Sequence, residues 1–440
     1  MRRLSRYLFA FASFVGVGCS AVSERAESRP AGAPVVTGGV QEAHAATLAS
    51  STGEISKTAG GEGRGGGGGG ATIRALRDSS ATPVIRALYV NRFAAQSPRR
   101  MRWLVSVADS TEINGFVIDM KDEFGLNFRS DSAPFRRNEG IGHGMVHDVK
   151  ALVDTLHAHK IFATARIVVF KDPVAAQLNP TWTIRRPDGE MWQDKKGTRW
   201  VDPYNRALWE YNLGVADELV RLGFDEIQFD YIRFPEPYKS LPQQVFPASN
   251  GMSKPELLAT FLKTARERLN KLGVRSTADV FGFVTTVRGP LEVGQWWEKL
   301  APVTDVLLPM TYPSHFPHGT FGIPRPNAEP YQIQKISIDA ARERDQKLGI
   351  TAPEHIRPWL QAFSLGKPEY GPEQLQAQKQ AVYDAGYDGW VLWHPGSKYE
   401  AYLPALEKGE LVSHKKNQER EPNTNGNRVT PDTEIVRKPK

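Results

Sequence analysis

The chain has 440 residues, of which 40% are hydrophobic and 10% aromatic, and its formal net charge is +7. This is enough apolar material for one large core, since a single α/β barrel typically needs ~250 residues. No Lys/Arg run is long enough to line a groove, which argues against a nucleic-acid partner despite the positive charge. The single cysteine, Cys19, excludes an intramolecular disulfide.

The N-terminus is typical of a secretory signal. The basic stretch MRRLSR is followed by the apolar stretch YLFAFASFVGVG and then by Cys19, and the apolar part is too short to span a membrane. The arrangement resembles a bacterial lipoprotein signal, in which the cysteine becomes the lipidated first residue of the mature chain. Such signals usually carry Leu three positions before the cysteine, where this chain has Gly16, so an ordinary signal peptide with an incidental cysteine is the alternative. We expect residues 1–19 to be a signal peptide and Cys19 the lipidation site. Ser20 favours anchoring at the outer membrane, and without lipidation the protein would be periplasmic or secreted.

Both ends of the remaining chain are poor in core-forming residues. Residues 20–82 are rich in Gly, Ala and Ser and include an uninterrupted run from Gly65 to Gly70. No Gly-Lys-Ser/Thr follows that run, so it is a flexible tether and not a phosphate loop. Residues 409–440 are polar, charged and rich in Pro and Asn, which predicts a disordered tail. One folded domain is therefore expected over residues 83–408.

Within this domain, short apolar runs alternate with amphipathic stretches. Eight runs are predicted as strands: VIRALYV (from Val84), GFVIDM (Gly115), IFATARIVVF (Ile161), DEIQFDYI (Asp225), STADVFGFV (Ser276), DVLLPMTY (Asp305), IRPWLQAF (Ile356) and GWVLWH (Gly389). Such near-continuous apolar runs are typical of strands buried on both faces.

Amphipathic stretches with helical periodicity lie between these strands, for example over 146–160, 206–223 and 254–273. Glycines at the expected helix C-caps support these assignments, namely Gly223, Gly273, Gly349 and Gly386. Eight strands that alternate with helices predict a (β/α)₈ TIM barrel. A doubly wound open sheet is the main rival, but it normally has a glycine-rich turn after its first strand, where this chain reads VNRFAAQSP.

The longest connection, residues 171–205, carries Trp182, Trp192, Trp200 and Tyr204. Long loops in compact domains are usually functional. These aromatic side chains could stack on sugar rings or could simply close the top of the barrel, and the sequence leaves both possibilities open.

The C-terminal ends of the strands hold the active site of a TIM barrel, and Asp230 is the strongest candidate there. It lies late in a strand that is otherwise apolar, where an isolated charge is costly. Asp225 begins the same strand an odd number of residues earlier, so it should face away at the bottom of the barrel with a structural role. Gln228 shares the face of Asp230, and Arg233 could either bind a ligand or pair with Asp230.

Glycoside hydrolysis needs two carboxyl groups. Asp279 on the next strand is the natural partner for Asp230, and Asp119 on the second strand is the other candidate, unless Lys121 merely neutralises it. The other polar and aromatic side chains expected to bind substrate at these strand ends are Lys121, Asp122, Arg166, Gln228, Arg233, Tyr312, Gln361, Trp393 and His394.

No metal site or other cofactor is expected. His157 and His159 have a spacing that zinc enzymes use at the end of a barrel strand, but here the pair falls at the end of a predicted helix. A serine hydrolase is also disfavoured, because the chain has no G-x-S-x-G motif.

Several segments resemble the glycosyl hydrolase domain family once catalogued as domain of unknown function 4015. The resemblance covers about Val84 to Leu406 and rests on IRALYVN, NGFVIDMKDEFG, ATARIVVFKDP, NPTW through WVDPYN, GFDEIQFDYIRFP, LLPMTYPSHF and GWVLWHPG. It implies a TIM barrel distantly related to the α-amylase-like hydrolases, with no established substrate.

The chain departs from the better-known relatives at several site positions. α-Amylases carry an Arg two residues before the fourth-strand nucleophile, a Glu on the fifth strand and an Asp on the seventh, where this chain has Gln228, Asp279 and Gln361. Chitinase-type barrels carry a Glu two residues after the Asp that matches Asp230, where this chain has Ile232. Asp230 matches in both comparisons, and its partner matches in neither.

Two main hypotheses therefore remain, beside a third in which the protein is a scaffold tethered to the envelope by its long linker. The first is an exported glycoside hydrolase that acts on an envelope or extracellular polysaccharide through Asp230 and either Asp279 or Asp119. The second is a non-catalytic barrel, tethered to the envelope, that binds a carbohydrate polymer or oligosaccharide.

Overall fold

The computed structural model describes residues 82–140 and 144–414. The predicted signal peptide with Cys19, the predicted linker up to residue 81 and the tail from residue 415 lie outside these described residues. Within the described ranges, no helix combines the length and the apolar character needed to cross a membrane.

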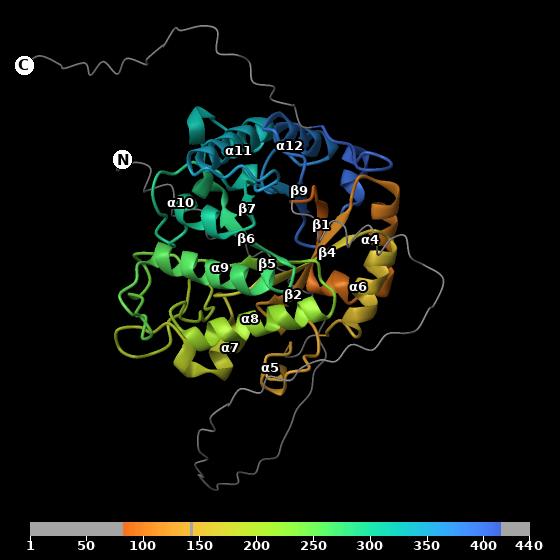
Figure 1. Cartoon of the computed structure of the whole chain (residues 1–440). Helices are drawn as coiled ribbons and strands as arrows, with labels where there is room; N and C mark the ends of the chain where they lie inside the picture. The colour runs from red at the N-terminus through yellow and green to blue at the C-terminus, as the bar shows by residue number, and fades with distance from the viewer. Residues whose placement is uncertain (1–81, 141–143, 415–440) are drawn as a thin grey trace, which may run out of the picture.

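The core of the domain is a closed barrel of eight parallel strands (Figure 1). The strands are β1 (Arg86–Val90), β2 (Gly115–Asp122), β4 (Phe162–Val168), β5 (Glu226–Asp230), β6 (Arg275–Phe281), β7 (Val306–Met310), β8 (Trp359–Gln361) and β9 (Trp390–Trp393). Each pairs with its neighbours in chain order, and pairing of β1 with both β9 and β2 closes the ring. The two-residue strand β3 (Gly125–Leu126) adds to β2 in the antiparallel sense. The predicted (β/α)₈ barrel is thus confirmed.

Helices surround the barrel, as Figure 1 shows. Those that connect successive barrel strands are α4 (Pro98–Ser110), α6 (Val149–Ala158), α8 (Arg206–Arg221), α9 (Lys254–Asn270), α10 (Trp297–Leu300), α11 (Pro330–Lys347) and α12 (Pro372–Asp384). After β9 the 3₁₀ helix η8 (Glu400–Ala405) takes the place of an eighth α-helix. Smaller helices lie in the loops: α3 (Arg92–Ala95), α5 (Ala133–Arg136), α7 (Pro173–Leu178), η2 (Pro180–Trp182), η3 (Gly282–Thr285), η4 (Ala301–Val303), η5 (Pro313–His315), η6 (Thr320–Gly322) and η7 (Pro326–Ala328).

Local sequence accounts for these elements. All residues of β2 are buried, as expected for a strand between the barrel interior and a layer of helices. The side chain of Asp148 caps α6 by accepting a hydrogen bond from the amide of Ala151. Gly223 and Gly273 follow the ends of α8 and α9 with φ values of 107° and 70°, the left-handed conformation that ends a helix and favours glycine.

The aromatic side chains of the long loop after β4 mainly close the barrel top. Trp192 and Trp200 are 0% and 1% exposed and belong to the main hydrophobic core. The indole N–H of Trp192 donates to the carbonyl of Pro242, and the hydroxyl of Tyr204 donates to the carbonyl of Met252. Their polar atoms therefore hold the loop against the following connection.

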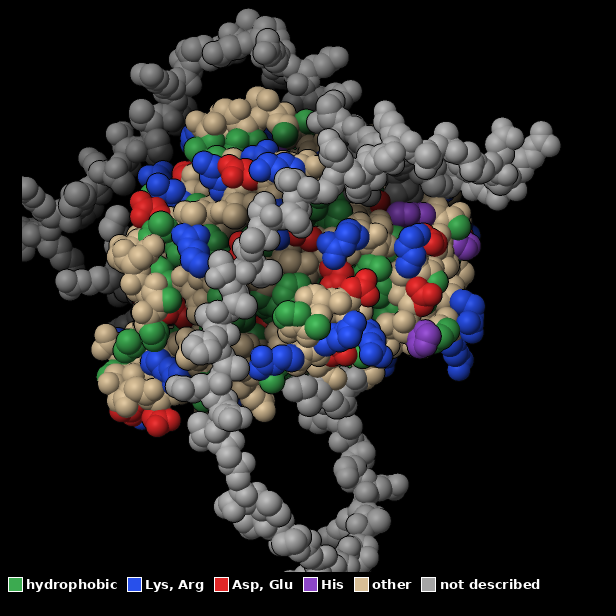
Figure 2. All heavy atoms as spheres, turned by 60° about the horizontal axis from the view of Figure 1, so that its bottom comes forward, with side chains coloured by type: hydrophobic (Ala, Val, Ile, Leu, Met, Phe, Trp, Pro, Cys, Tyr) green, Lys and Arg blue, Asp and Glu red, His purple; other side chains and the backbone are tan. Residues whose placement is uncertain are grey.

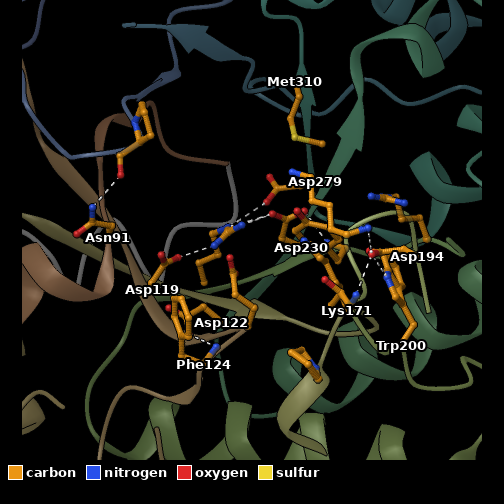
Figure 3. Close-up of a pocket in the computed structure, with 18 of the residues that line it drawn as sticks. Asn91, Asp119, Asp122, Phe124, Lys171, Asp194, Trp200, Asp230, Asp279 and Met310 are labelled. Carbon is orange, nitrogen blue, oxygen red and sulfur yellow. Dashed lines mark hydrogen bonds and ion pairs between the residues drawn. The ribbon is translucent and has the colours of Figure 1, made fainter. Parts of the chain in front are cut away.

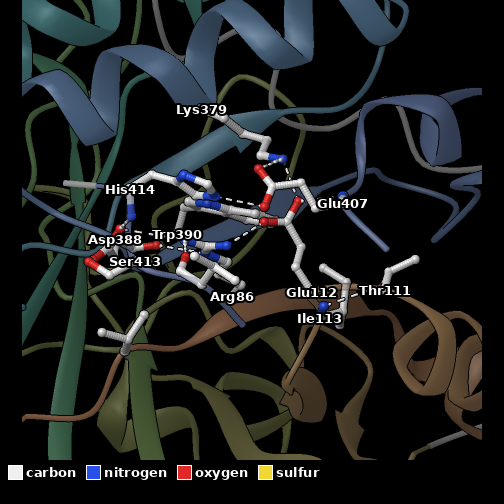
Figure 4. A network of polar contacts seen from close by, with 12 residues as sticks. Arg86, Thr111, Glu112, Ile113, Lys379, Asp388, Trp390, Glu407, Ser413 and His414 are labelled. Atoms are coloured by element: carbon white, nitrogen blue, oxygen red, sulfur yellow. Dashed lines mark hydrogen bonds and ion pairs between the residues drawn. The ribbon is translucent and has the colours of Figure 1, made fainter. Parts of the chain in front are cut away.

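The opposite end of the barrel is sealed by a buried charge network (Figure 4). Arg86, at the start of β1, donates to Glu112 at 2.5 Å and lies 3.5 Å from Asp388. The segment up to His414 covers this network. Arg86 donates to the carbonyl of Val412, and the amide of His414 donates to Asp388. The ordered contacts of the domain therefore continue beyond residue 408, where the sequence placed its boundary.

Asp225 also lies at this lower end, as predicted. Its carboxylate accepts a hydrogen bond from the amide of Ala163 at 2.8 Å and lies 2.9 Å from Nε2 of His157. Its structural role explains the placement of His157, since the imidazole contacts this carboxylate. Asp225 joins the neighbouring strand to the end of α6.

Candidate active site

A cavity of about 1050 Å³ opens at the C-terminal ends of the barrel strands (Figure 3). Each of the eight parallel strands contributes a lining residue: Tyr89, Asp119, Arg166, Asp230, Asp279, Met310, Trp359 and Trp393. This is the end at which TIM-barrel active sites are built. The cavity is therefore the candidate active site.

Arg166 of β4 lies at the centre of the three predicted catalytic carboxylates. One terminal nitrogen donates to Asp119 at 2.5 Å, and the other terminal nitrogen donates to Asp230. Nε donates to Asp230 at 3.1 Å and lies 3.8 Å from an oxygen of Asp279. Because one guanidinium reaches all three acids, the structure brings together the three residues that the sequence singled out.

Asp230 ends β5 and is 6% exposed at the cavity surface. Besides Arg166, the backbone amide of the next residue, Tyr231, donates to its carboxylate at 2.5 Å. Tyr231 has a φ of 53°, a left-handed conformation that costs a bulky residue on the order of 1–2 kcal/mol. This strained turn points the amide back at the carboxylate, so the backbone itself fixes the orientation of Asp230.

Asp279 of β6 is held from the barrel interior. The amide of Gln228 donates to both carboxylate oxygens at 2.9 and 3.0 Å, and the indole N–H of Trp359 donates to one of them at 2.6 Å. Burial raises the pKa of Asp279 well above its usual value, and the nearby charge of Asp230 raises it further. A proton on Asp279 is therefore favoured.

Asp119 of β2 also contacts Arg166, and it contacts Tyr89 as well. It accepts hydrogen bonds from Arg166 and, at 2.5 Å, from the hydroxyl of Tyr89. Burial raises the pKa of Asp119, although the charge of Arg166 opposes this shift. Three acids that face one guanidinium cannot all ionise cheaply in a buried cluster, because like charges disfavour one another.

Two charged residues that were predicted to bind substrate, Asp122 and Arg233, line the cavity and form ion pairs there. Asp122 pairs with Arg92 at 2.5 Å, and burial together with the charge of Asp119 raises its pKa to about 7. Arg233 pairs with Glu236 at 3.0 Å and not with Asp230. The salt bridge that the sequence offered for Asp230 is instead made by Arg166. Tyr312 and Trp393 also line the cavity, as predicted.

The structure directs Lys121 away from the cavity. The register of β2 against β4 shifts between Asp119 and Lys121, so the two side chains do not share a face as an ordinary strand would require. The ammonium of Lys121 pairs with Asp172 at 2.6 Å and lies 5.4 Å from the ring of Tyr211 in α8. Lys121 thus neutralises Asp172, and its expected role in substrate binding needs correction.

Three further predicted binding residues do not line the cavity. Gln228 is fully buried beneath Asp279 and positions it. Gln361 is also buried, where its side chain accepts from the amide of Ser314 and donates to the carbonyl of Phe363. Nδ1 of His394 accepts from the amide of Gly396, and burial lowers the pKa of His394 to about 4. These three side chains therefore hydrogen-bond to residues near the cavity and do not face it.

Some site residues were not found from the sequence. Tyr89 and Trp359 donate to the candidate acids Asp119 and Asp279, but both lie in strands where an aromatic side chain is indistinguishable from core packing. The one feature of the sequence that could have pointed to them is their position near the end of a predicted strand. Across 82–140 and 144–414, no group of three or more His, Cys, Asp or Glu side chains is placed to hold a metal ion.

The family that matches the chain is described as "Putative glycosyl hydrolase domain", domain of unknown function 4015, and its model matches residues 87–399. The chain belongs to this family. The match covers the barrel from β1 to the residues before η8, and it places the chain among the glycosyl hydrolases at family level. No curated protein matches the sequence.

Solved structures show further likeness. A hypothetical protein from Ruminiclostridium thermocellum is 36% identical, over 44% of this chain and 97% of that chain, with a TM-score of 0.40. The spore cortex-lytic enzyme SleL of Bacillus megaterium is 10% identical, over 73% of this chain and 72% of its own, with a TM-score of 0.44. The maltogenic α-amylase AmyB of Thermotoga neapolitana is 14% identical, over 77% of this chain and 71% of its own, with a TM-score of 0.44.

The geometry explains one departure from the α-amylase pattern. Gln228 occupies the position where those enzymes carry an Arg, and it binds Asp279. The guanidinium beside Asp230 comes from Arg166 on the preceding strand. A side chain from the neighbouring strand therefore supplies the charge that the expected position lacks.

Proposed function

We propose that this family member is a glycoside hydrolase that cleaves an envelope or extracellular polysaccharide by a two-carboxylate mechanism. Asp230 acts as the carboxylate, either as nucleophile or as base for water, and Asp279 acts as the proton donor. The observation that carries the proposal is the cluster at the cavity floor, in which one guanidinium holds Asp230 while burial favours the protonated form of Asp279.

One atom of Arg166 lies near both acids, so the two carboxyl groups lie close together. Nε of Arg166 lies 3.1 Å from one oxygen of Asp230 and 3.8 Å from one oxygen of Asp279. Glycosidases separate their carboxyl groups by about 5–5.5 Å when they retain the anomeric configuration and by about 6.5–9.5 Å when they invert it. Asp119 is the alternative proton donor, since its pKa is also raised by burial.

Replacement of Asp230 by Asn tests the proposal. Turnover of a susceptible glycan should fall by at least about a hundredfold, because a reacting carboxylate is lost, while the variant still binds the glycan. Asp225→Asn is the matched control, because it makes the same chemical change at the opposite end of β5 and should preserve turnover per folded molecule. Unchanged hydrolysis by Asp230→Asn would show that the assignment is wrong.

Variants of the two candidate donors decide between them. Asp279→Asn should remove the limb of the pH–rate profile that reports the proton donor, and Asp119→Asn should leave that limb in place. The opposite result assigns the proton donor to Asp119.

A non-catalytic carbohydrate-binding barrel is the second candidate. The observation that favours it is that Asp279 is only 1% exposed and already accepts hydrogen bonds from Gln228 and Trp359. Such a protein would bind glycan equally well before and after the Asp230→Asn substitution, and no glycan in a broad hydrolysis screen would be cleaved.

We also propose that the protein is exported and anchored in the outer membrane through a lipid on Cys19. The supporting observation is the basic, apolar and cysteine-containing order of residues 1–19. Labelling of the protein with a radioactive fatty acid, and loss of the label in Cys19→Ala, tests this anchor. Full labelling of the Cys19→Ala variant would contradict it.

A further inference from the structure

One wall of the cavity is rich in cations. Lys171 follows β4, residues 195–199 belong to the loop before α8, and Arg233 follows β5. The cationic side chains of this wall are Lys171, Lys195, Lys196, Arg199 and Arg233. Figure 3 shows Lys171 and Trp200 on one side of Asp230, and Asp119 and Asp122 on the other. The cavity is therefore electrically asymmetric about its central carboxylate.

Lys171 is one of the members of this wall that lie beside the residue following Asp230. Its ammonium is half-buried and lies 5.0 Å from the ring centroid of Tyr231, the residue that follows Asp230. Within the part of the chain that the structure describes, no carboxylate lies within 4.0 Å of its Nζ, and the same holds for Lys195, Lys196 and Arg199. Among the described residues, none of these four cations is therefore neutralised by a carboxylate.

Two acidic groups of the wall, Asp194 and Glu236, have structural partners. Asp194 accepts from the indole N–H of Trp200 at 3.0 Å and from the amides of Lys196 and Thr198 at 2.9 Å, so it shapes the loop. Glu236 pairs with Arg233. Glu123 is exposed at the cavity rim. The cations therefore outnumber the acids on this wall, and most of the acids already have partners.

Aromatic rings lie among these cations. The guanidinium of Arg233 lies between Trp200, Tyr231 and Phe281, at 4.9, 5.0 and 4.8 Å from their ring centroids. The ammonium of Lys195 lies 3.4 Å from the ring centroid of Tyr238. Aromatic faces accept the apolar faces of ring-shaped ligands, and ammonium and guanidinium groups make charge-assisted hydrogen bonds to carboxylates.

We propose that this wall is a subsite for an acidic sugar, so that the substrate is a polysaccharide whose units carry carboxylates. The sugar next to the cleaved bond places its carboxylate toward Lys171, and the following units lie along Lys195, Lys196 and Arg199. This inference rests on the proposed function only for the cleavage, because the subsite itself can be tested by binding.

Binding to matched pairs of glycans tests the subsite. The probes are polygalacturonate, alginate and hyaluronan oligosaccharides, each beside its carboxyl-reduced counterpart, which keeps the linkages and removes the charge. Calorimetry with the full-length Asp230→Asn protein measures affinity without hydrolysis. At least one acidic glycan should bind at least about tenfold more tightly than its reduced counterpart, a difference of about 1.4 kcal/mol. This preference should shrink as salt is raised, because salt screens the exposed charges.

Two substitutions locate the preference. Lys171→Met and, separately, Lys195→Met in the exposed loop should each reduce binding of the acidic glycan several-fold and leave binding of its reduced counterpart unchanged. Lys263→Met is the matched control, because its side chain is exposed on α9 and forms an ion pair within that helix. It should change neither affinity.

The outcomes separate the two proposals. If no acidic glycan is preferred, or if the preference survives both substitutions, the subsite inference is wrong, whether or not Asp230-dependent hydrolysis is found. If the preference depends on Lys171 but wild-type protein cleaves none of the probes or a broader glycan panel, the subsite is supported and the hydrolase proposal fails.

Discussion

Arg166 is the cation that holds the three acids of the candidate active site together. Its replacement by Met should destabilise the domain to an extent that depends on pH. The substitution keeps most of the side-chain stem but removes the cation that contacts Asp119 and Asp230 and lies 3.8 Å from Asp279. The side chain of Arg166 is 11% exposed, and those of the three acids are at most 9% exposed. Three nearly buried carboxyl groups would then face one another without a counter-charge.

The magnitude follows from the cost of removing one partner of a buried ion pair, which is ~3–5 kcal/mol. Protonation limits this cost. An Asp whose unfolded pKa is about 3.9 can be held neutral at pH 7 for roughly 4 kcal/mol, at about 1.4 kcal/mol for each pH unit. We therefore expect the free energy of unfolding to fall by about 3–5 kcal/mol at pH 7.

The sign of the pH dependence follows from linkage. Loss of Arg166 raises the folded-state pKa values of Asp119 and Asp279, because the cation lowers both values in the intact cluster. A carboxyl group whose pKa is raised by folding does not lower the free energy of unfolding when the pH is below its unfolded pKa of about 3.9. It lowers this free energy by the full amount when the pH is above its folded pKa. The difference between wild type and variant should therefore shrink as pH falls from 7 toward about 4.

Urea unfolding at a series of pH values measures this difference. Arg266→Met is the control, since Arg266 pairs with Asp305 at a more exposed site, where loss of an ion pair costs about 1 kcal/mol or less. A loss below about 1 kcal/mol at pH 7, or a loss that does not change between pH 7 and 4, would refute the account of the cluster.

Two further predictions concern residues outside the cavity. Lys121→Met should lower the free energy of unfolding by roughly 3–5 kcal/mol, because it leaves Asp172 buried without its cation. The folded variant should bind glycan as wild type does, and weakened binding with unchanged stability in calorimetry and urea unfolding would contradict this. A chain that ends at Lys408 should lose about 1–3 kcal/mol relative to one that ends at His414, because Arg86 and Asp388 lose buried hydrogen bonds. Equal urea midpoints for the two truncated chains would show that the segment contributes nothing.

The barrel was predictable because the alternation of an apolar run with an amphipathic stretch is repeated along the chain. Eight apolar runs became eight parallel strands, and Gly223, Gly273, Gly349 and Gly386 all have positive φ after the helices. The position of Asp230 at the cavity was also predictable, because the residue lies late in a buried strand and the C-terminal ends of barrel strands face the site. Asp225 could be separated from it because strand geometry places the ends of β5 at opposite ends of the barrel.

The partners of these residues were not predictable from local sequence. Arg233 follows Asp230 closely in sequence but pairs with Glu236, while Arg166, which lies 64 positions away, contacts Asp230. Lys121 was expected to bind substrate or to neutralise Asp119, but the strand register shifts between the two residues and Lys121 pairs with Asp172. Strand pairing and register bring distant residues together, and a single sequence does not encode them in any local pattern.

The amino-acid sequence by itself therefore determined the fold, predicted the end of the barrel at which the cavity opens, and singled out Asp230 as its leading candidate acid. Periodic burial specifies these features residue by residue, because each strand and helix must place its apolar side chains in the core. Only the tertiary structure decided that Arg166 joins Asp230 to Asp119 and Asp279, that burial favours a proton on Asp279, and that one cavity wall is cationic. These properties depend on distances between separate strands and on exclusion of water, and both arise when the barrel closes.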